Sequence, residues 1–457
     1  MSGGIFPPRA HGPALRDPAR PPLRTSLRLL RLPIPRSTFG RNVLTLASGT
    51  ALAQAIPVFA SPVLTRLFDP AAFGVLAVYL AVVTIGAVAV TGRYELAVLI
   101  PREDEEARDL LAVAVALSVG LSLLAASVLL LLYWPLAGRL PLPPVPRWAL
   151  VVPFGILLTA VFQSLGYWLN RRARYRPLVT SRVSQSGAMF GTQLTGGALG
   201  AASGALVGGH VTGQLVGIAV LVRNAFRLDG QLLRAVSWTS MKRAAFVHRR
   251  FPFFIVPGHV ANATSSQLPT ILLASFFGPA VAGLYSLAER VLVLPTSLIG
   301  SSIGDVYRQE AAETYHRLGN CRELYLRTLK RLAMIAVVPC GIVIAAGPWL
   351  FAFAFGAEWR DAGAIASILA AMVFFQIISS PLSQTVLLAN MHKLELAWQA
   401  ARVAVAFGSI YAGFAIFHDY LVGVALYAAG FALLHLTHSV MQYLAASGYA
   451  PLTANTA

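Results

Sequence analysis

The chain has 457 residues, of which 56% are hydrophobic and only 12% are charged. This is too little charge to cover the surface of a soluble protein of this size, so a soluble globular class is excluded. The formal net charge of +18 could indicate a nucleic-acid partner. Basic segments between apolar runs that face an anionic membrane leaflet account for the charge more simply, and we expect no nucleic-acid partner.

Twelve apolar runs, each near the ~20 residues that a bilayer core requires, predict an all-α polytopic membrane protein. Lys and Arg concentrate in every second connecting segment: 29 of 36 lie on one side of the membrane, four on the other and three inside spans. The positive-inside rule therefore predicts that both termini are cytoplasmic. The predicted spans are 43–65, 73–97, 109–134, 148–169, 178–199, 202–222, 251–276, 280–304, 332–355, 363–389, 395–417 and 420–445.

The segment before the first span, residues 1–40, is rich in Arg and Pro and lacks the apolar core of a cleavable signal peptide. Leu23, Leu27 and Leu30 recur in it at helical spacing, next to arginines. The segment is therefore either a short helix lying on the inner leaflet or a cytoplasmic tail without a role of its own.

A repeated sequence divides the spans into two halves. Residues 68–74 read Phe-Asp-Pro-Ala-Ala-Phe-Gly and residues 277–283 read Phe-Gly-Pro-Ala-Val-Ala-Gly, and each copy links the first and second spans of its half. Parallel repeats are typical of transporters in which two lobes rock around a central cavity and expose it to each side in turn. We predict an N-terminal six-helix lobe at 41–222, a basic cytoplasmic linker at 223–250, a C-terminal six-helix lobe at 251–445 and a tail at 446–457.

Glycines recur four residues apart in the fifth and sixth spans, which predicts close packing of helix backbones within the first lobe. A dimer face is the alternative interpretation. The glycines are Gly196, Gly200, Gly204 and Gly208, followed by Gly209, Gly213 and Gly217.

Four arginines in or near the spans are the candidate substrate-binding residues, because a charge within a span costs at least ~2.5 kcal/mol. Arg290 lies ten residues into the eighth span, roughly 15 Å deep, and Arg402 lies roughly 10 Å into the eleventh. Arg93 lies near the cytoplasmic end of the second span and Arg66 near the outer end of the first. Guanidinium groups bind phosphate oxygens bidentately, so these residues predict a cationic cavity for an anionic substrate. The alternative for Arg66 and Arg93 is that they extend to the membrane interface.

Two carboxylates, Glu289 and Glu95, accompany these arginines. Glu289 points about 100° away from Arg290 on a helix, so we expect the two not to pair. Each carboxylate is either a counter-ion to another arginine or a group whose protonation is coupled to transport.

Several other chemistries are not indicated. The histidines have no metal-ligand spacing with Cys or acidic residues, so we expect no metal. There is no Walker A sequence, no cofactor motif and no outer loop long enough for a catalytic domain, the longest being around 135–147. The acidic run at 103–106 is typical of a solvated helix start. We therefore expect a transporter and not an enzyme.

Four stretches resemble bacterial polysaccharide transporters. They are Leu-Thr-Arg-Leu-Phe-Asp-Pro-Ala-Ala-Phe-Gly (64–74) with Gly-Arg-Tyr-Glu-Leu-Ala-Val (92–98), Tyr-Ser-Leu-Ala-Glu-Arg-Val-Leu-Val-Leu-Pro-Thr-Ser-Leu-Ile-Gly (285–300), and Ser-Ser-Pro-Leu-Ser-Gln (379–384). On these stretches the chain is similar to the oligosaccharide flippases of the Wzx type. Their superfamily also holds the multidrug (MATE) exporters and the lipid II flippase, and the resemblance covers residues 40–445.

The resemblance implies a flippase in the bacterial inner membrane. Such proteins move a polyprenyl-diphosphate-linked oligosaccharide to the periplasmic leaflet for O-antigen, capsule or exopolysaccharide synthesis. A polysaccharide polymerase and a chain-length regulator would be its partners, together with membrane lipids. The alternative within the same fold is a MATE-like exporter of drugs or other amphipaths, which would favour buried carboxylates over arginines.

Overall fold

The computed structural model describes residues 38–133, 147–388 and 392–448, and all regular structure in these ranges is helical. The chain separates into two units, residues 1–44 and 45–457, and the arrangement below concerns the second. The predicted helix around Leu23–Leu30 and most of the 135–147 loop lie outside the described residues.

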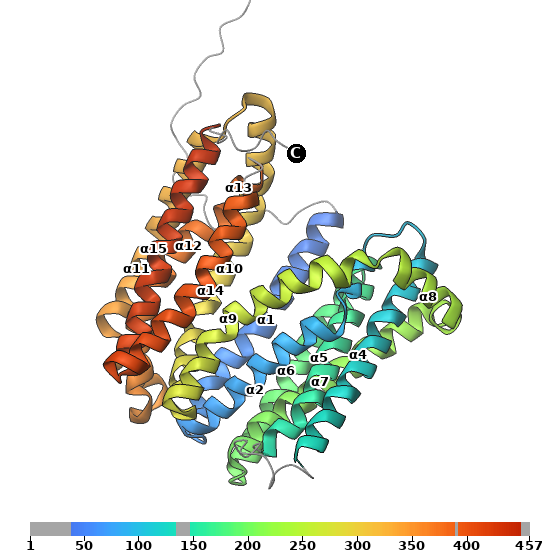
Figure 1. Ribbon diagram of the computed structural model, residues 1–457, viewed down its shortest axis with the longest axis horizontal. Coiled ribbons are helices and arrows are strands. Elements are labelled where there is room, and N and C mark those ends of the chain that lie inside the picture. The colour runs from blue at the N-terminus through green and yellow to red at the C-terminus, as the bar shows by residue number, and fades with distance from the viewer. Residues whose placement is uncertain (1–37, 134–146, 389–391, 449–457) are drawn as a thin grey trace, which may run out of the picture. The chain divides into compact units, whose positions relative to one another are not determined.

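Fifteen α-helices follow one another in the described ranges, coloured from blue to red along the chain in Figure 1. The earlier ones are α1 (Thr38–Leu64), α2 (Pro70–Val90), α3 (Tyr94–Ala97), α4 (Asp104–Tyr133), α5 (Val152–Arg171), α6 (Tyr175–Ala198), α7 (Ala202–Arg234) and α8 (Trp238–Val247). The later ones are α9 (Val256–Phe277), α10 (Pro279–Leu318), α11 (Arg322–Phe355), α12 (Arg360–Ser379), α13 (Gln384–Leu388), α14 (His392–Ala412) and α15 (Tyr420–Ala446).

Each of the twelve predicted spans corresponds to one of the long helices, so the predicted all-α fold class is confirmed. Within the described residues, eight helices are long and apolar enough to cross a membrane, and α1 adds a shorter apolar stretch, Ala51–Leu64. The helices α6, α9 and α10 do not meet that measure over their described residues. The chain is a multi-pass membrane protein.

Two predicted span boundaries were wrong. The second span was expected to reach residue 97, but α2 ends at Val90 and the chain turns through Gly92 and Arg93, both with φ near +60°. Only a separate turn of helix, α3, follows. The tenth span was expected to reach 389, but α12 ends at Ser379, because Pro381 has no N–H to continue its hydrogen bonds.

Two connecting segments that the charge count placed outside the membrane are largely helical. In the predicted 223–250 linker, α7 continues to Arg234 and α8 follows after three residues. Between the eighth and ninth spans, α10 extends to Leu318 and α11 begins at Arg322. A change from apolar to basic residues therefore marks the end of a membrane span here without ending the helix.

Helix packing separates two groups within residues 45–457. The helices α2 and α4–α7 pack on one another, and α9–α12 pack with α14 and α15. Contacts between the groups are made mainly by α2, which packs on α9 and α10, as Figure 1 shows for α2 and α9. The exact lobe boundaries stay a prediction.

The two copies of the repeated sequence meet directly where α2 and α10 cross. A Cβ atom added to Gly74 would overlap the carbonyl oxygen of Pro279, and one added to Gly283 would overlap the carbonyl oxygen of Pro70. Each glycine is thus the fifth residue of its helix and packs on the first residue of the other. The absence of side chains at both positions allows the backbones to touch.

The predicted glycine ladder packs helices at only some of its positions. Added Cβ atoms at Gly209 and Gly213 would come within 2.9 Å of α6 backbone oxygens, and Gly217 faces Phe162 of α5. Gly204 and Gly208, in contrast, have nothing within 4 Å of an added Cβ. One face of α7 therefore packs closely on α6 and α5 through its glycines. On its other face, side chains would fit at Gly204 and Gly208 without overlap.

Candidate functional site

A cavity of about 400 Å³ lies between helices of the two groups, and we call it the central cavity. The helices α1, α2, α6 and α7 form one side of it, and α10 supplies Arg290 and Val293. Its walls are mostly apolar, with polar groups from Gln54, Gln193 and His210. Among the described residues that line it there is no Asp or Glu.

Arg290 is the one charged residue that lines the central cavity within the described part of the chain. Its guanidinium carbon lies 5.9 Å from the centre of the Phe73 ring, at the limit of a cation–π contact. No carboxylate among the described residues lies within 4 Å of its guanidinium nitrogens. Its charge is therefore open to an anionic ligand in the cavity.

Phe73 itself is fixed by a contact between the two helix groups. Its ring meets the edge of Trp359 at a centroid distance of 4.9 Å, and Trp359 is fully buried. The indole Nε1 of Trp359 donates a hydrogen bond of 3.1 Å to the carbonyl oxygen of Thr65, 294 residues earlier in the chain. Arg290 thus lies next to a described contact between the groups.

His210, which also lines the central cavity, belongs to a buried polar chain. The Tyr79 hydroxyl lies 3.3 Å from Nδ1 of His210, and Nε2 of the same ring lies 3.3 Å from the side-chain nitrogen of Gln214. Gln193 donates to the carbonyl oxygen of Leu206 at 3.1 Å. The ring nitrogens of His210 and the side-chain nitrogen of Gln193 are thus engaged by other residues of the bundle.

Glu289 and Arg402 lie together in a different place, a cavity of about 100 Å³ that we call the small cavity. Helices α9, α10, α12, α14 and α15 line it, and Tyr285, Tyr427 and His435 add polar groups. Glu289 does not line the central cavity and Arg290 does not line the small one, as their 100° separation on α10 predicts. Val293 borders both cavities.

Aromatic rings hold Arg402 in the small cavity. Its guanidinium carbon lies 5.1 Å from the Trp398 ring centre and 5.7 Å from that of Phe431. Its Nη1 donates to Oε1 of Gln399 at 3.0 Å. Planar stacking of this kind suits a guanidinium and would not suit an ammonium group.

A third cavity, of about 500 Å³, lies among α2, α5, α6 and α7, and we call it the side cavity. Arg93 and Arg182 line it together with polar groups of Tyr167, Asn170 and Gln163. Polar residues of both α5 and α6 line this cavity, including Ser181 of α6.

Arg93 occupies a strained position at the edge of the side cavity. It adopts a left-handed conformation with φ 58°, which a residue with a Cβ rarely adopts. Its Nη1 donates to Oε1 of Glu95 at 2.9 Å, and the Glu95 side chain is fully buried. Arg93 Nε and Glu95 Oε2 are buried without a hydrogen-bond partner in the described structure. Glu95 therefore lies where a counter-ion to Arg93 would lie.

The structure does not bring the four predicted arginines into one site. Arg290 lines the central cavity, Arg402 the small cavity and Arg93 the side cavity. Arg66 is exposed in the turn between α1 and α2 and lines none of the three. The roles of these residues, and of Glu289 and Glu95, stay predictions.

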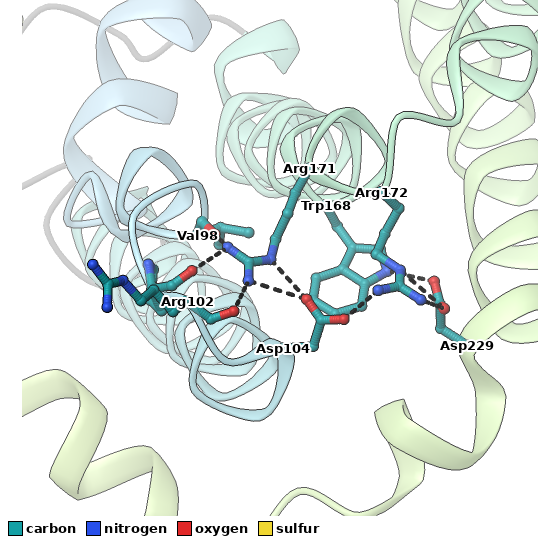
Figure 2. A network of polar contacts seen from close by, with 8 residues as sticks. Val98, Arg102, Asp104, Trp168, Arg171, Arg172 and Asp229 are labelled. Atoms are coloured by element: carbon teal, nitrogen blue, oxygen red, sulfur yellow. Dashed lines mark hydrogen bonds and ion pairs between the residues drawn. The ribbon is translucent and has the colours of Figure 1, made fainter.

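An ion-pair network ties together the ends of α4, α5 and α7, as Figure 2 shows. Asp104 accepts from both Arg171 and Arg172, and Arg171 also donates to the carbonyl oxygens of Val98 and Pro101. Asp229, at a non-helical point of α7, accepts from Arg172 at 2.8 Å and from Trp168 Nε1 at 3.3 Å. These contacts join three helices, with Asp229 buried and Asp104 partly exposed.

The sequence interpretation missed several of these residues. Arg171, Arg172 and Arg182 were counted only as cations of a connecting segment, although Arg182 faces the side cavity. Asp104 was read as part of a solvated helix start, and it in fact joins two arginines. A signal was available for Arg182, because it lies about one helical turn after residue 178, where the fifth span was predicted to begin. A residue at that depth lies inside the membrane and not in the connecting segment. No group of His, Cys, Asp or Glu in the described residues has the arrangement of a metal site.

Residues 63–364 match the sequence model of a family described as polysaccharide biosynthesis protein. The succinoglycan biosynthesis transport protein ExoT of Rhizobium meliloti (strain 1021) is 26% identical over 319 residues, which are 68% of this chain and 61% of that protein. The match thus spans less than two thirds of that relative.

Two solved structures have a similar fold. One is the lipid II flippase MurJ in an inward closed conformation, with a TM-score of 0.61 and 14% identity over 87% of this chain and 86% of that one. The other is an inward-facing multidrug resistance MATE family transporter of the MOP superfamily, with a TM-score of 0.57 and 15% identity over 88% and 93%. At these identities the likeness establishes the fold.

Proposed function

Because the chain belongs to the polysaccharide biosynthesis protein family, we propose that it is a flippase for a polyprenyl-diphosphate-linked oligosaccharide. It would move this lipid from the cytoplasmic to the periplasmic leaflet of a bacterial inner membrane, with both of its own termini in the cytoplasm. The translocated unit would then enter O-antigen, capsule or exopolysaccharide assembly. The similarity to ExoT, a succinoglycan biosynthesis transport protein, supports this class of substrate.

The observation on which the proposal depends is the charge of the central cavity. Arg290 lines it. Of the acidic residues that the structure describes, none lines the cavity and none pairs with Arg290. A guanidinium held in a site of low dielectric attracts phosphate oxygens strongly and binds two of them at once. A diphosphate is therefore the substrate group that this cavity suits.

The remaining walls suit the rest of such a substrate. The side-chain amides of Gln54 and Gln193 offer hydrogen-bonding groups for sugar hydroxyls. At about 400 Å³ the cavity holds only part of a lipid-linked oligosaccharide, so the polyprenyl chain would extend into the bilayer. The arginines of the side cavity, Arg93 and Arg182, would attract the same anionic group before or after it reaches Arg290.

Export of cationic drugs is the alternative that the fold allows, given its likeness to a MATE family transporter. Such a substrate would be repelled by Arg290 and would find no carboxylate on the central cavity wall. Glu289, which neighbours Arg290 on α10, lines the small cavity instead. The charge distribution therefore favours the anionic lipid.

The test measures which leaflet contains the lipid-linked oligosaccharide. Cells with and without the protein are compared by mass spectrometry of the extracted polyprenyl-diphosphate sugars, and intact spheroplasts are probed with a lectin that cannot cross the membrane. We expect the lipid to accumulate unexposed without the protein and to become accessible to the lectin with it. Equal amount and exposure in both cases would refute the proposal.

Variants of Arg290 connect this result to the cavity. Arg290→Ala should abolish most of the exposure at normal protein levels, and Arg290→Lys should restore only part of it, because an ammonium group cannot bind two phosphate oxygens in a fixed plane. Arg360→Ala is the matched control, since Arg360 is exposed and lines none of the three cavities. Full exposure with Arg290→Ala would remove this residue from the mechanism.

A further inference from the structure

An apolar groove of about 360 Å³ runs between α4 and α8, away from the three cavities described above. Its α4 wall includes the small residues Ala116 and Gly120, and its α8 wall includes Trp238, Met241 and Lys242. A Cβ added to Gly120 would have nothing within 4 Å, so the space beside it is open. Lys242 is the one charged residue on the groove wall.

The α4 side of the groove belongs to a surface that faces lipid. Further along α4, Leu121, Leu123 and Leu124 are 41%, 60% and 59% exposed, in a helix that is long and apolar enough to span the membrane. A groove that opens on such a surface is in contact with acyl chains. Small residues at its base allow one chain to lie closer to the helix than its neighbours do.

The α8 side has the composition of a helix at the membrane interface. Trp238, Phe246 and Val247 are each at least 60% exposed, which is unusual for large apolar side chains in water. Residues 238–250 contain four cations and no acidic residue. This combination of aromatic, apolar and basic residues is typical of helices that lie on an anionic leaflet.

Two contacts hold α8 in place beside α4. The Tyr94 hydroxyl donates to the carbonyl oxygen of Ala245 at 3.0 Å, and Tyr94 is itself part of the groove wall. His248 Nε2 lies 2.9 Å from Oε1 of Glu106 on α4. Lys242 Nζ lies 5.2 Å from the centre of the Trp238 ring, which places the positive charge next to the apolar wall. The groove is thus a built feature with one cation at its rim.

We propose that the groove between α4 and α8 binds one acyl chain of an anionic phospholipid, whose phosphate pairs with Lys242. The chain occupies the space beside Gly120 and Ala116, and the headgroup lies at the level of α8, where the other cations of residues 238–250 add to the attraction. This lipid is a resident of the bilayer and not the transported substrate, so the inference is independent of the proposed function.

The experiment titrates the purified full-length protein in detergent with phosphatidylglycerol or phosphatidylcholine of matched acyl chains and counts bound lipids by native mass spectrometry. We expect phosphatidylglycerol to bind more tightly. Lys242→Ala should weaken phosphatidylglycerol about fivefold, which corresponds to the ~1 kcal/mol that one basic residue contributes at an anionic surface, and should leave phosphatidylcholine unchanged. Lys330→Ala, at an exposed lysine of α11, is the control and should change neither.

A second pair of variants tests the chain site. Gly120→Leu fills the groove and should reduce the binding of both lipids there, whereas Gly341→Leu, at a helical glycine that also has nothing within 4 Å of an added Cβ, should not. Ala116→Leu fills the same groove from the next turn and replaces Gly120→Leu if that variant does not fold. The proposal would be overturned if the two lipids bound equally. It would also be overturned if the two lysine variants, or the two glycine variants, had equal effects on lipid binding. If the protein instead formed a dimer that Gly120→Leu dissociated and that excess phosphatidylglycerol did not, a second copy of the chain would occupy the groove, and the proposal would also be overturned.

Discussion

Substitution of Gly74 tests the crossing of α2 and α10 most directly. Replacing glycine with alanine inside a helix ordinarily stabilises it, by roughly 0.5–1 kcal/mol, because alanine has less backbone freedom to lose. At Gly74 the new methyl group would overlap the carbonyl oxygen of Pro279, which is backbone and cannot rotate away. The two helices must then move apart.

The expected magnitude follows from these two opposing effects. Overpacking in a rigid environment costs typically ~1–3 kcal/mol, and a backbone neighbour places Gly74→Ala near the upper value. After the gain in helix propensity is subtracted, the free energy of unfolding should fall by about 2 kcal/mol. Gly208→Ala, in α7, should raise it by up to ~1 kcal/mol, because nothing lies within 4 Å of the new Cβ.

Thermal unfolding of the purified variants in one detergent measures the sign of both changes. Gly74→Ala should melt below the parent protein and Gly208→Ala at or above it. The double variant Gly74→Ala with Gly283→Ala should cost less than the sum of the single variants, since both substitutions separate the same pair of helices. The close crossing would be refuted if Gly74→Ala melted at the same temperature as Gly208→Ala. It would also be refuted if the double variant lost as much stability as the two single variants together.

Three further predictions concern the rest of the bundle. Asp229→Asn removes the charge that holds Arg172 and should lower the free energy of unfolding by about 1–3 kcal/mol in thermal melts, because the Asp229 side chain is only 4% exposed. Arg182→Ala should reduce lectin-accessible oligosaccharide in cells, since Arg182 lines the side cavity. Burial raises the pKa of the Cys321 thiol, so in a Cys340→Ser background its maleimide labelling should be slow at pH 7 and accelerate up to and beyond pH 9, as thiolate forms.

Each of these has a control within the chain. Glu323→Gln breaks an exposed pair with Arg327 and should change the melting little, so an equal loss would contradict the role of the Asp229 network. Arg176→Ala removes an exposed charge six residues before Arg182 and should leave oligosaccharide exposure intact. Labelling of folded Cys321 at pH 7 as fast as that of the unfolded chain would contradict its burial.

The positions of the membrane spans could be predicted because the bilayer imposes one length on every apolar run. Where a run ends is less visible, because a helix continues past the membrane when its next residues are helix-forming and basic. The extensions of α7 to Arg234 and of α10 to Leu318 are of this kind. The turn at Gly92 and Arg93 was missed for the opposite reason: the residues around it are apolar enough to continue the span, and a left-handed arginine has no signature in composition.

The candidate site was less predictable than the fold. Depth along a helix singled out Arg290 as a candidate, and its angular distance from Glu289 predicted that the two do not pair. In the structure the two residues line different cavities. Which helices meet around each residue depends on packing between distant segments, such as the contact of Trp359 with Thr65. The separation of Arg290, Arg402 and Arg93 into three cavities could not be obtained from spacing along the chain.

The polarity of α6 and α9 links the fold to the proposed transport. Both helices are long enough to span the membrane, and neither is apolar enough by composition. Their polar residues face cavities: Gln193 of α6 lines the central cavity, Arg182 of α6 the side cavity, and Ser265 and Ser266 of α9 the small cavity. A polar residue inside a bilayer is tolerated where it faces protein or water instead of lipid. The same residues that lower the hydropathy of these helices therefore form the polar interior that an anionic, sugar-bearing lipid requires.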